Sequence, residues 1–165
     1  LFLTGPSMLR VLDILPADRA EAQPFGSVRL EHDQRRLRRK LLTLPDGTEI
    51  LLDLPQTTAL KHGALLKLED ARLVRVEAAE EPLYEILAKD AGHLLRLAWH
   101  IGNRHTPAQL DENRILIKRD HVLKTMLEGL GATVANISEP FFAEHGAYHS
   151  HNHAEPGHAL LARLP

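Results

Sequence analysis

The chain has 165 residues, which is enough for one compact domain or two small ones. Its 20 basic and 22 acidic residues leave a formal net charge of −2, which argues against a general nucleic-acid or membrane-surface binder, since both need a basic excess. The absence of cysteine excludes disulfides, thiolate catalysis and cysteine-based metal sites. No apolar run reaches the roughly 18 residues of a membrane span, and the N-terminal stretch lacks the pattern of a signal peptide. We therefore expect a cytoplasmic protein.

The first half of the chain has the pattern of short β-strands. A strand is expected over residues 8–14. Residues 38–44 and 49–54 flank a Pro-Asp-Gly-Thr turn, in which Gly47 supplies the positive φ that a hairpin needs. Residues 64–68 and 72–77 form a second expected pair. The sequence therefore predicts a small N-terminal β-domain over residues 1–79.

The second half alternates between strands and helices. Strands are expected over residues 83–87, 108–110, 114–118 and 133–137. Asp90 and Asp120 are suitable N-caps for two intervening helices, the first ended by Gly102 and Asn103 and the second by Gly131. The side chains expected to face inward are Leu94, Leu97, Ala98 and Ile101 in the first helix, and Val122, Leu123, Met126, Leu127 and Leu130 in the second. The order βαββαβ predicts a ferredoxin-like domain over residues 80–138. The whole chain is thus expected to be α+β, with a flexible histidine-containing tail over residues 139–165.

Eleven histidines are the unusual feature of the composition. Five of them fall between residues 145 and 158: His145, His149, His151, His153 and His158. Alternating histidines cannot build a core, because each buried ring nitrogen would need a partner. Neutral imidazole is a common ligand of Zn, Cu and Ni, so the tail is well suited to metal capture. The alternative is a solubilising tail whose histidines are incidental.

His100 and His105 flank the end of the first predicted helix. His100 falls on or beside the apolar stripe, where a packed structural role is the simpler interpretation. His105 lies beyond the helix end, in an expected exposed corner where the partial negative charge of the helix terminus mildly favours a cation. His121 stands at the start of the second helix, where the helix dipole opposes a metal. His32, His62 and His93 are expected to be isolated surface residues.

Residues 35–40 carry five basic side chains in six positions. This run could dock an acidic partner or nucleic acid. We favour the alternative, a solvated edge strand whose charges discourage aggregation.

No motif for catalysis is present. The sequence contains no His-Glu-x-x-His, no Gly-x-Ser-x-Gly and no glycine-rich phosphate loop. The protein is therefore not expected to be an enzyme.

The block His-Ile-Gly-Asn-Arg-His at residues 100–105, followed by Pro107 and Gln109, resembles the UreE family of urease accessory proteins, which are nickel metallochaperones. The resemblance is reinforced by Arg-Asp-His-Val-Leu at residues 119–123, Pro-Phe at 140–141, Gly-Ala-Tyr at 146–148 and the histidine-rich end. Residues 45–47 and 52–55 also resemble the family's N-terminal domain.

This resemblance implies an N-terminal β-domain that contacts partners and a C-terminal domain that binds metal and forms a homodimer. It implies that His105 is the principal ligand, contributed by both subunits to one Ni(II) ion at the two-fold axis. His121 matches a secondary ligand position, although Arg119 stands where some relatives have a second histidine. Completion of the metal shell is expected from tail residues, namely His145, His149, His151 and His153.

The implied function is delivery of Ni(II) as cargo for assembly of the urease active site. The expected partners are the urease apoprotein and the other urease accessory proteins, including their GTPase component, with no nucleic acid and no membrane. The alternative is a storage or buffering protein for Zn(II), Cu(II) or Ni(II) without a urease recipient. A third interpretation is a structural adaptor with incidental histidines.

Overall fold

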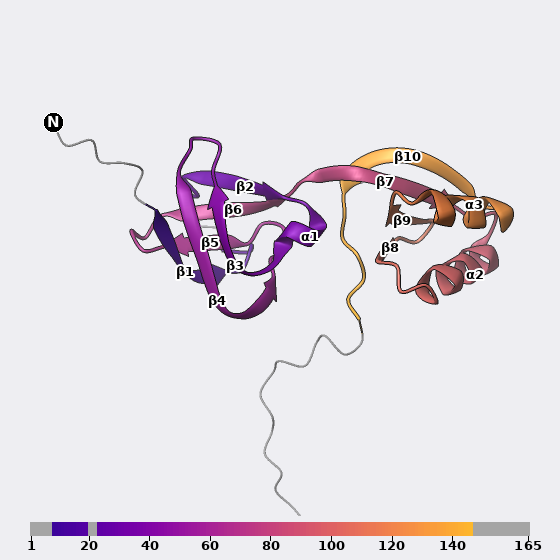
Figure 1. Cartoon of the computed structure of the whole chain (residues 1–165), viewed down its shortest axis with the longest axis horizontal. Coiled ribbons are helices and arrows are strands. Elements are labelled where there is room, and N and C mark those ends of the chain that lie inside the picture. Colours follow the sequence, from indigo (N-terminus) through magenta and orange to yellow (C-terminus); the bar gives the residue numbers. More distant parts are fainter. Residues whose placement is uncertain (1–7, 20–22, 147–165) are drawn as a thin grey trace, which may run out of the picture.

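The computed structural model describes residues 8–19 and 23–146. Within them the chain forms two α+β lobes, each built on its own β-sheet, as Figure 1 shows. This arrangement confirms the predicted fold class. None of the helices in these ranges combines the length and the hydropathy needed to cross a bilayer.

The N-terminal domain is a six-stranded sheet with one short helix. Its strands lie in the order β2-β6-β5-β1-β4-β3. The elements are β1 (Leu9–Leu15), β2 (Gly26–Leu30), α1 (His32–Arg35), β3 (Arg36–Thr43), β4 (Glu49–Ala59), β5 (Leu65–Leu68) and β6 (Leu73–Ala78). The predicted hairpin joins β3 to β4, with Gly47 at a φ of 87° and the Asp46 carboxylate accepting a hydrogen bond from the Thr48 amide.

Two elements of this domain were not predicted. Strand β2 buries only Val28 and Leu30, so its apolar pattern is too short to stand out. Helix α1 has four residues and no apolar periodicity; the side chain of Gln34 accepts a hydrogen bond from the amide of Glu31 at its start. Both elements depend on the tertiary fold more than on local sequence.

The C-terminal domain has the predicted order βαββαβ. It consists of β7 (Glu80–Leu87), α2 (Ala91–Gly102), β8 (Ala108–Leu110), β9 (Arg114–Lys118), α3 (His121–Gly129) and β10 (Thr133–Pro140). The sheet order is β10-β7-β9-β8, and every pairing is antiparallel. Asp90 and Asp120 cap the two helices as expected, each accepting a hydrogen bond from backbone amides of the first turn.

The two helices cover one face of the four-stranded sheet. Leu97 and Ile101 of α2, and Leu123 and Leu127 of α3, are buried in the same core as the inward side chains of β7 and β9. The expectation that Val122 and Leu130 also face inward is wrong, because Val122 is 65% exposed and Leu130 is 38% exposed. Val122 lies about 100° around the helix from Leu123, and Leu130 is the C-cap residue beyond the last turn.

The end of β10 closes the other face of this sheet. The strand continues to Pro140, beyond the predicted end at residue 137, and Phe141 is fully buried with Leu83 and Leu116. The predicted tail therefore begins with residues that belong to the folded domain. An apolar residue next to a strand end carries no periodic signal, which is why this burial could not be recognised in the sequence.

Helix α1 and Phe141 join the two domains. Arg35 is buried and donates hydrogen bonds to the carbonyl oxygens of Leu30 and Phe141. The Lys118 ammonium lies 2.7 Å from the Asp33 carboxylate, and this hydrogen bond holds the pKa of Asp33 below its ordinary value. The two domains are thus connected by contacts of Asp33 and Arg35 in α1 as well as by the chain between β6 and β7.

Replacing Phe141 with alanine is expected to destabilise the protein by about 3–5 kcal/mol, the usual cost of a large cavity in a core. The matched control is Phe142→Ala, since Phe142 is 44% exposed and its loss should cost about 1 kcal/mol or less. Equilibrium unfolding in guanidinium chloride measures both changes. Equal losses for the two variants would contradict the assignment of Phe141 to the core.

Candidate metal site

The end of α2 presents His105 to solvent. After Gly102 the chain continues in a tight turn, in which the amide of Arg104 donates to the carbonyl of Ile101 and the amide of His105 donates to the carbonyl of Gly102. His105 has a φ of 53°, and the only other non-glycine residue with positive φ in the described ranges is Ala71. Such a conformation costs a side chain with a Cβ roughly 1 kcal/mol. The exposed imidazole is therefore held at the corner by a backbone shape that few residues adopt.

His100 lies on the helix and has a different environment. It is half-buried, and its ring stands edge-on to Trp99 with 5.1 Å between the centroids. Its carbonyl accepts a hydrogen bond from the guanidinium of Arg104. These contacts agree with a packed residue, and they leave His105 as the accessible histidine of the pair.

Helix α2 also exposes two large apolar side chains. Leu95 is 72% exposed and Trp99 is 64% exposed, and their four-residue spacing puts them on one face of the helix. Leu97 and Ile101 occupy the buried face. Leu95 and Trp99 were not predicted to be functional residues, although their spacing outside the core stripe is a signal that can be read in the sequence. An apolar face of this kind on a folded domain is typical of a contact surface.

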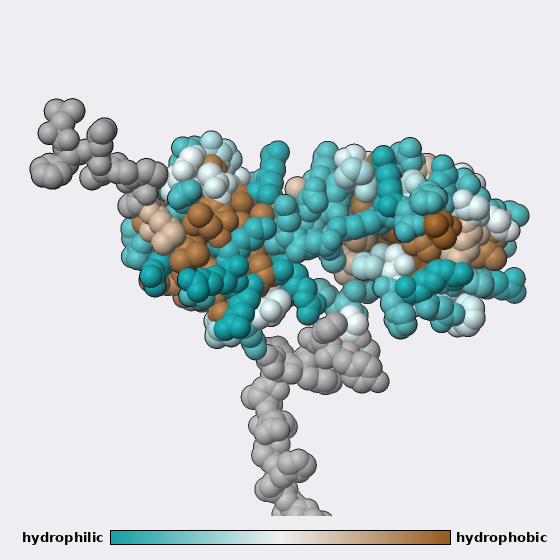
Figure 2. Space-filling model, in the orientation of Figure 1, coloured by the Kyte–Doolittle hydropathy of each residue, from teal (hydrophilic) through white to brown (hydrophobic). Residues whose placement is uncertain are grey.

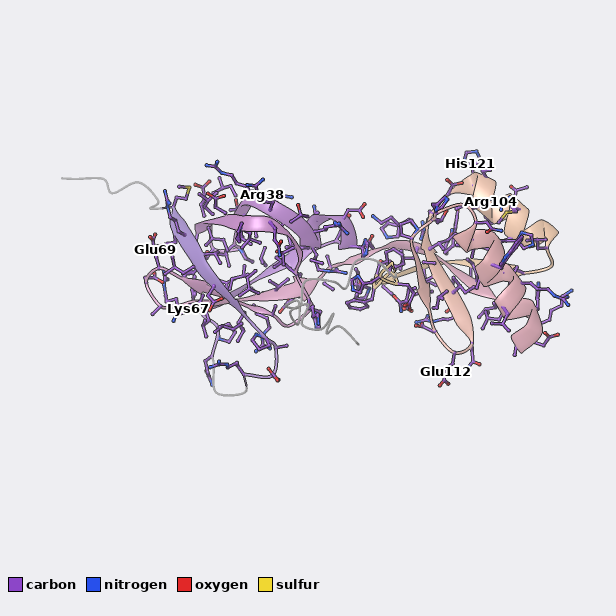
Figure 3. All side chains as sticks on the ribbon, turned by 90° about the horizontal axis from the view of Figure 1, so that it is seen from below. Arg38, Lys67, Glu69, Arg104, Glu112 and His121 are labelled. Atoms are coloured by element: carbon purple, nitrogen blue, oxygen red, sulfur yellow. The ribbon has the colours of Figure 1, made fainter. Side chains whose placement is uncertain are left out.

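His121 is exposed in the first turn of α3. In the view of Figure 3, His121 lies at the same side of the C-terminal domain as Arg104, the neighbour of His105, while Glu112 lies at the opposite side. No contact between the rings of His105 and His121 brings them into one ligand set. Across the ranges that the structure describes, no three histidine or acidic side chains are grouped to hold a metal ion.

The chain after Phe141 returns toward the turn that carries His105. The amide of Phe142 donates to the side chain of Gln109, and the amide of Glu144 donates to the carbonyl of Ala108. These hydrogen bonds hold the chain along β8, which begins three residues after His105. The exposed His145 follows directly. His149, His151 and His153 lie outside the described residues.

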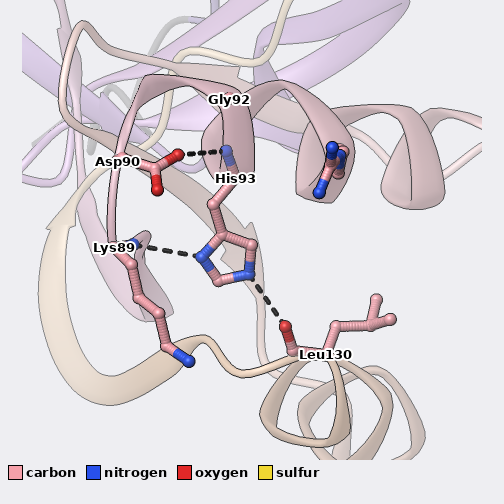
Figure 4. Close-up of a pocket in the computed structure, with 6 residues that line it drawn as sticks. Lys89, Asp90, Gly92, His93 and Leu130 are labelled. Atoms are coloured by element: carbon pink, nitrogen blue, oxygen red, sulfur yellow. Dashed lines mark hydrogen bonds between the residues drawn. The ribbon is translucent and has the colours of Figure 1, made fainter.

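His93 is a structural residue, and the expectation that it is isolated at the surface is wrong. Figure 4 shows that both of its ring nitrogens are hydrogen-bonded: Nδ1 accepts from the amide of Lys89, and Nε2 lies 2.8 Å from the carbonyl oxygen of Leu130. The neutral tautomer with hydrogen on Nε2 satisfies both contacts. His93 therefore links the start of α2 to the end of α3 and has no free nitrogen for a metal.

His32 and His62 also have partners. The His32 ring packs against Phe141 with 5.1 Å between the centroids, and its Nδ1 lies 3.1 Å from the carboxylate of Asp33. His62 accepts a hydrogen bond from the amide of Ala78 through Nδ1. The expectation that these two histidines are isolated is therefore wrong. Their contacts assign both to the packing of the N-terminal domain and of its junction with the C-terminal domain.

Comparisons with known proteins identify the family. The model of the UreE urease accessory protein N-terminal domain matches residues 11–79, and that of the C-terminal domain matches residues 81–160. A urease accessory protein UreE from Agrobacterium fabrum is 54% identical over 144 residues, which cover 87% of this chain and 89% of the relative. The protein of the same description from Rhizobium leguminosarum bv. trifolii is 50% identical, covering 92% of this chain and 80% of its own length. That of Rhizobium meliloti is 49% identical, with 88% and 95% covered.

The fold and these matches define a two-domain accessory protein. The chain belongs to the UreE family of urease accessory proteins.

Proposed function

We propose that the protein is a non-enzymatic nickel metallochaperone that binds Ni(II) between two copies of itself and delivers it for assembly of the urease active site. Membership of the UreE family supports the role in urease maturation. The observation that carries the metal-binding part is the position of His105, an exposed imidazole at a left-handed corner directly after a helix with an exposed apolar face.

The apolar face of α2 supports a homodimer. In a two-fold dimer each residue of the contact meets the equivalent surface of the other copy. Contact through Leu95 and Trp99 would remove both side chains from water and would bring the two copies of His105 toward the same axis. A shared ion is the chemical consequence, because each subunit then contributes one imidazole.

Two imidazoles do not complete a nickel site. Ni(II) takes about four to six nitrogen and oxygen ligands in square-planar or octahedral sets. The path of residues 142–145 along β8 supports a contribution from the tail, because it directs the chain toward the turn of His105. The further ligands that we propose are His121, His145, His149, His151 and His153, with water at the remaining positions. A shell completed by tail residues can also be dismantled, as delivery requires.

The proposed recipients are the urease apoprotein and the accessory proteins that act with it, including the GTPase component, in the cytoplasm. Imidazole sites bind Cu(II) more tightly than Ni(II) and also bind Zn(II), so the identity of the cargo depends on supply and on the recipient. The cluster of histidines in residues 145–158 also favours a second candidate function, storage or buffering of Zn(II), Cu(II) or Ni(II). Incubation of the nickel-loaded protein with apo-urease and its accessory proteins distinguishes them: a carrier activates urease in the presence of a chelator that removes free Ni(II), and a buffer does not.

Removal of residues 147–165 is expected to reduce the number of Ni(II) ions bound, because four histidines are lost, while an ion shared by two chains persists with weaker affinity. Calorimetry gives the number of ions per chain, and X-ray absorption at the nickel edge gives the number of imidazoles around each. Full-length protein is the control. An unchanged imidazole number in the truncated protein would exclude the tail histidines beyond His145 from the shell.

A further inference from the structure

The outer edge of β3 is open. One side of this eight-residue strand pairs with β4, while the other side adjoins no strand in the described part of the chain. The backbone groups on that side are available to hydrogen-bond an additional extended chain. The predicted solvated edge strand is confirmed for the four basic residues between positions 36 and 40, whereas it is wrong for Arg35, which is buried in α1.

The second edge of the same sheet, β2, lies close to the end of β3. A Cβ atom at Gly26 of β2 would lie 3.2 Å from the side chain of Leu44, which directly follows β3, so the two edges of the sheet approach each other at this end. A surface groove lies at this approach. Its lining residues are Ser27, Val28 and Arg29 on one side, and Thr43, Leu44 and Pro45 on the other. The edge of β3 is therefore continuous with a groove, which an extended chain can enter at its end.

The basic side chains of β3 are not neutralised within the described structure. Arg36, Arg38, Arg39 and Lys40 are all exposed, and none forms an ion pair there. Asp53 is the cross-strand neighbour of Arg39 in β4, yet the two are not paired. Two other exposed arginines of this domain do have partners, Arg29 with Glu77 and Arg72 with Asp70. In a chain of net charge −2, this strip is a local excess of positive charge that an acidic ligand complements.

Exposed apolar side chains lie in the same domain as the basic residues of β3. Leu41, in the same strand, is 45% exposed, and Leu12 of β1 is 65% exposed. Figure 2 shows hydrophobic side chains at the surface of this domain over β1, β4 and β3, surrounded by hydrophilic ones. A strand added to β3 would place alternate side chains on this face and could cover Leu41.

We propose that the open edge of β3 binds an extended acidic segment of a partner protein as an added β-strand. Backbone hydrogen bonds to β3 supply affinity, carboxylates of the segment pair with the arginines, and an apolar side chain of the segment packs on Leu41. This docking surface is separate from the metal site, which lies in the other domain. Its test therefore does not depend on nickel binding.

Edge protection is the competing explanation, since charges on an edge strand also prevent self-association. The two explanations differ in what they require of a ligand. Protection requires only that the strand repels copies of itself, whereas docking requires recognition of an extended acidic chain. A proline in the ligand discriminates further, because it removes a backbone donor without changing the charge.

The experiment measures binding of a fluorescein-labelled peptide of four Glu-Val repeats to the full chain. Binding is measured by fluorescence anisotropy at low salt. Three other probes are compared with it: a Lys-Val peptide, a Glu-Val peptide with a central proline, and a labelled oligothymidylate of similar charge. The test variant carries Arg38→Glu and Arg39→Glu. The matched control carries Lys67→Glu and Arg75→Glu on β5 and β6; both of those residues are exposed, and Lys67 lies well apart from Arg38 in Figure 3. Circular dichroism and thermal unfolding check the fold of both variants.

We expect the Glu-Val peptide to bind, with affinity reduced about tenfold or more by the β3 substitutions and by the central proline, and changed less than about twofold in the control variant. Absence of binding would overturn the proposal in favour of edge protection. Equal binding of the proline peptide would show attraction by charge alone and would also overturn it. Stronger binding of the oligothymidylate than of the Glu-Val peptide would assign the strip to nucleic acid instead.

Discussion

Substitution of His105 by alanine is expected to abolish the ion shared by two chains and to leave binding by the tail. Because the proposed site is symmetric, one substitution removes two imidazoles from each dimer. The tight class of Ni(II) sites should therefore fall from one ion per two chains to none in a calorimetric titration, and the weaker sites of residues 145–158 should remain. Unchanged stoichiometry of the tight site would contradict the central role of His105.

Two control variants separate the ligand from the backbone. Alanine at position 105 retains the strain of the left-handed conformation, whereas asparagine tolerates it and lacks an imidazole. His105→Asn should therefore lose the shared ion as completely as His105→Ala, at equal or higher stability. His62→Ala, in the N-terminal domain, removes an exposed histidine elsewhere and should leave the tight site intact. If His62→Ala had the same effect as His105→Ala, the loss would not be specific to the turn after α2.

Substitution of Trp99 by glutamate is expected to dissociate the proposed dimer. Each dimer would carry two carboxylates in an apolar contact related by the two-fold axis, and both desolvation and like-charge repulsion oppose association. We expect the dimer dissociation constant to rise by about 100-fold or more, equivalent to about 2.7 kcal/mol. Sedimentation velocity over a range of protein concentrations, without metal and with Ni(II), measures the change.

The matched control for this prediction is Leu12→Glu. Leu12 is 65% exposed, against 64% for Trp99, but lies on β1 of the N-terminal domain. Its substitution should leave the dimer intact. A dimer that survives Trp99→Glu, or that is lost equally in Leu12→Glu, would place the subunit contact away from α2.

Local chemistry in the sequence determines much of this fold. The caps Asp90 and Asp120, the Gly47 turn and the apolar stripe of α2 each act within a few residues, and each appears where it was predicted. The exposed corner at His105 was also predicted, since Gly102, Asn103 and Pro107 end the helix by local effects. The role of His105 as a ligand came from resemblance to the UreE family and stays a prediction.

Contacts between distant segments could not be predicted in the same way. One ring nitrogen of His93 bonds to the carbonyl of Leu130, and the burial of Phe141 depends on β7 and β9. Helix α1 is too short for a periodic pattern, yet it carries Arg35, whose basic character suggested a solvated strand. In each case the environment of the side chain is set by a segment many residues away, which the local pattern does not specify.

The buried Arg35 has a mechanical consequence. Its guanidinium is held by the carbonyl of Phe141, and the Phe141 side chain is held in the core of the other domain. Rotation of one domain against the other would break the hydrogen bond to Phe141 and leave the carbonyl of Leu30 as the remaining hydrogen-bond acceptor of a buried cation, which is unfavourable. We therefore expect the two domains to move as one rigid body. A displacement of the N-terminal domain, for example on binding a partner, would then be transmitted to Phe141 and so to the start of the histidine-rich C-terminal segment.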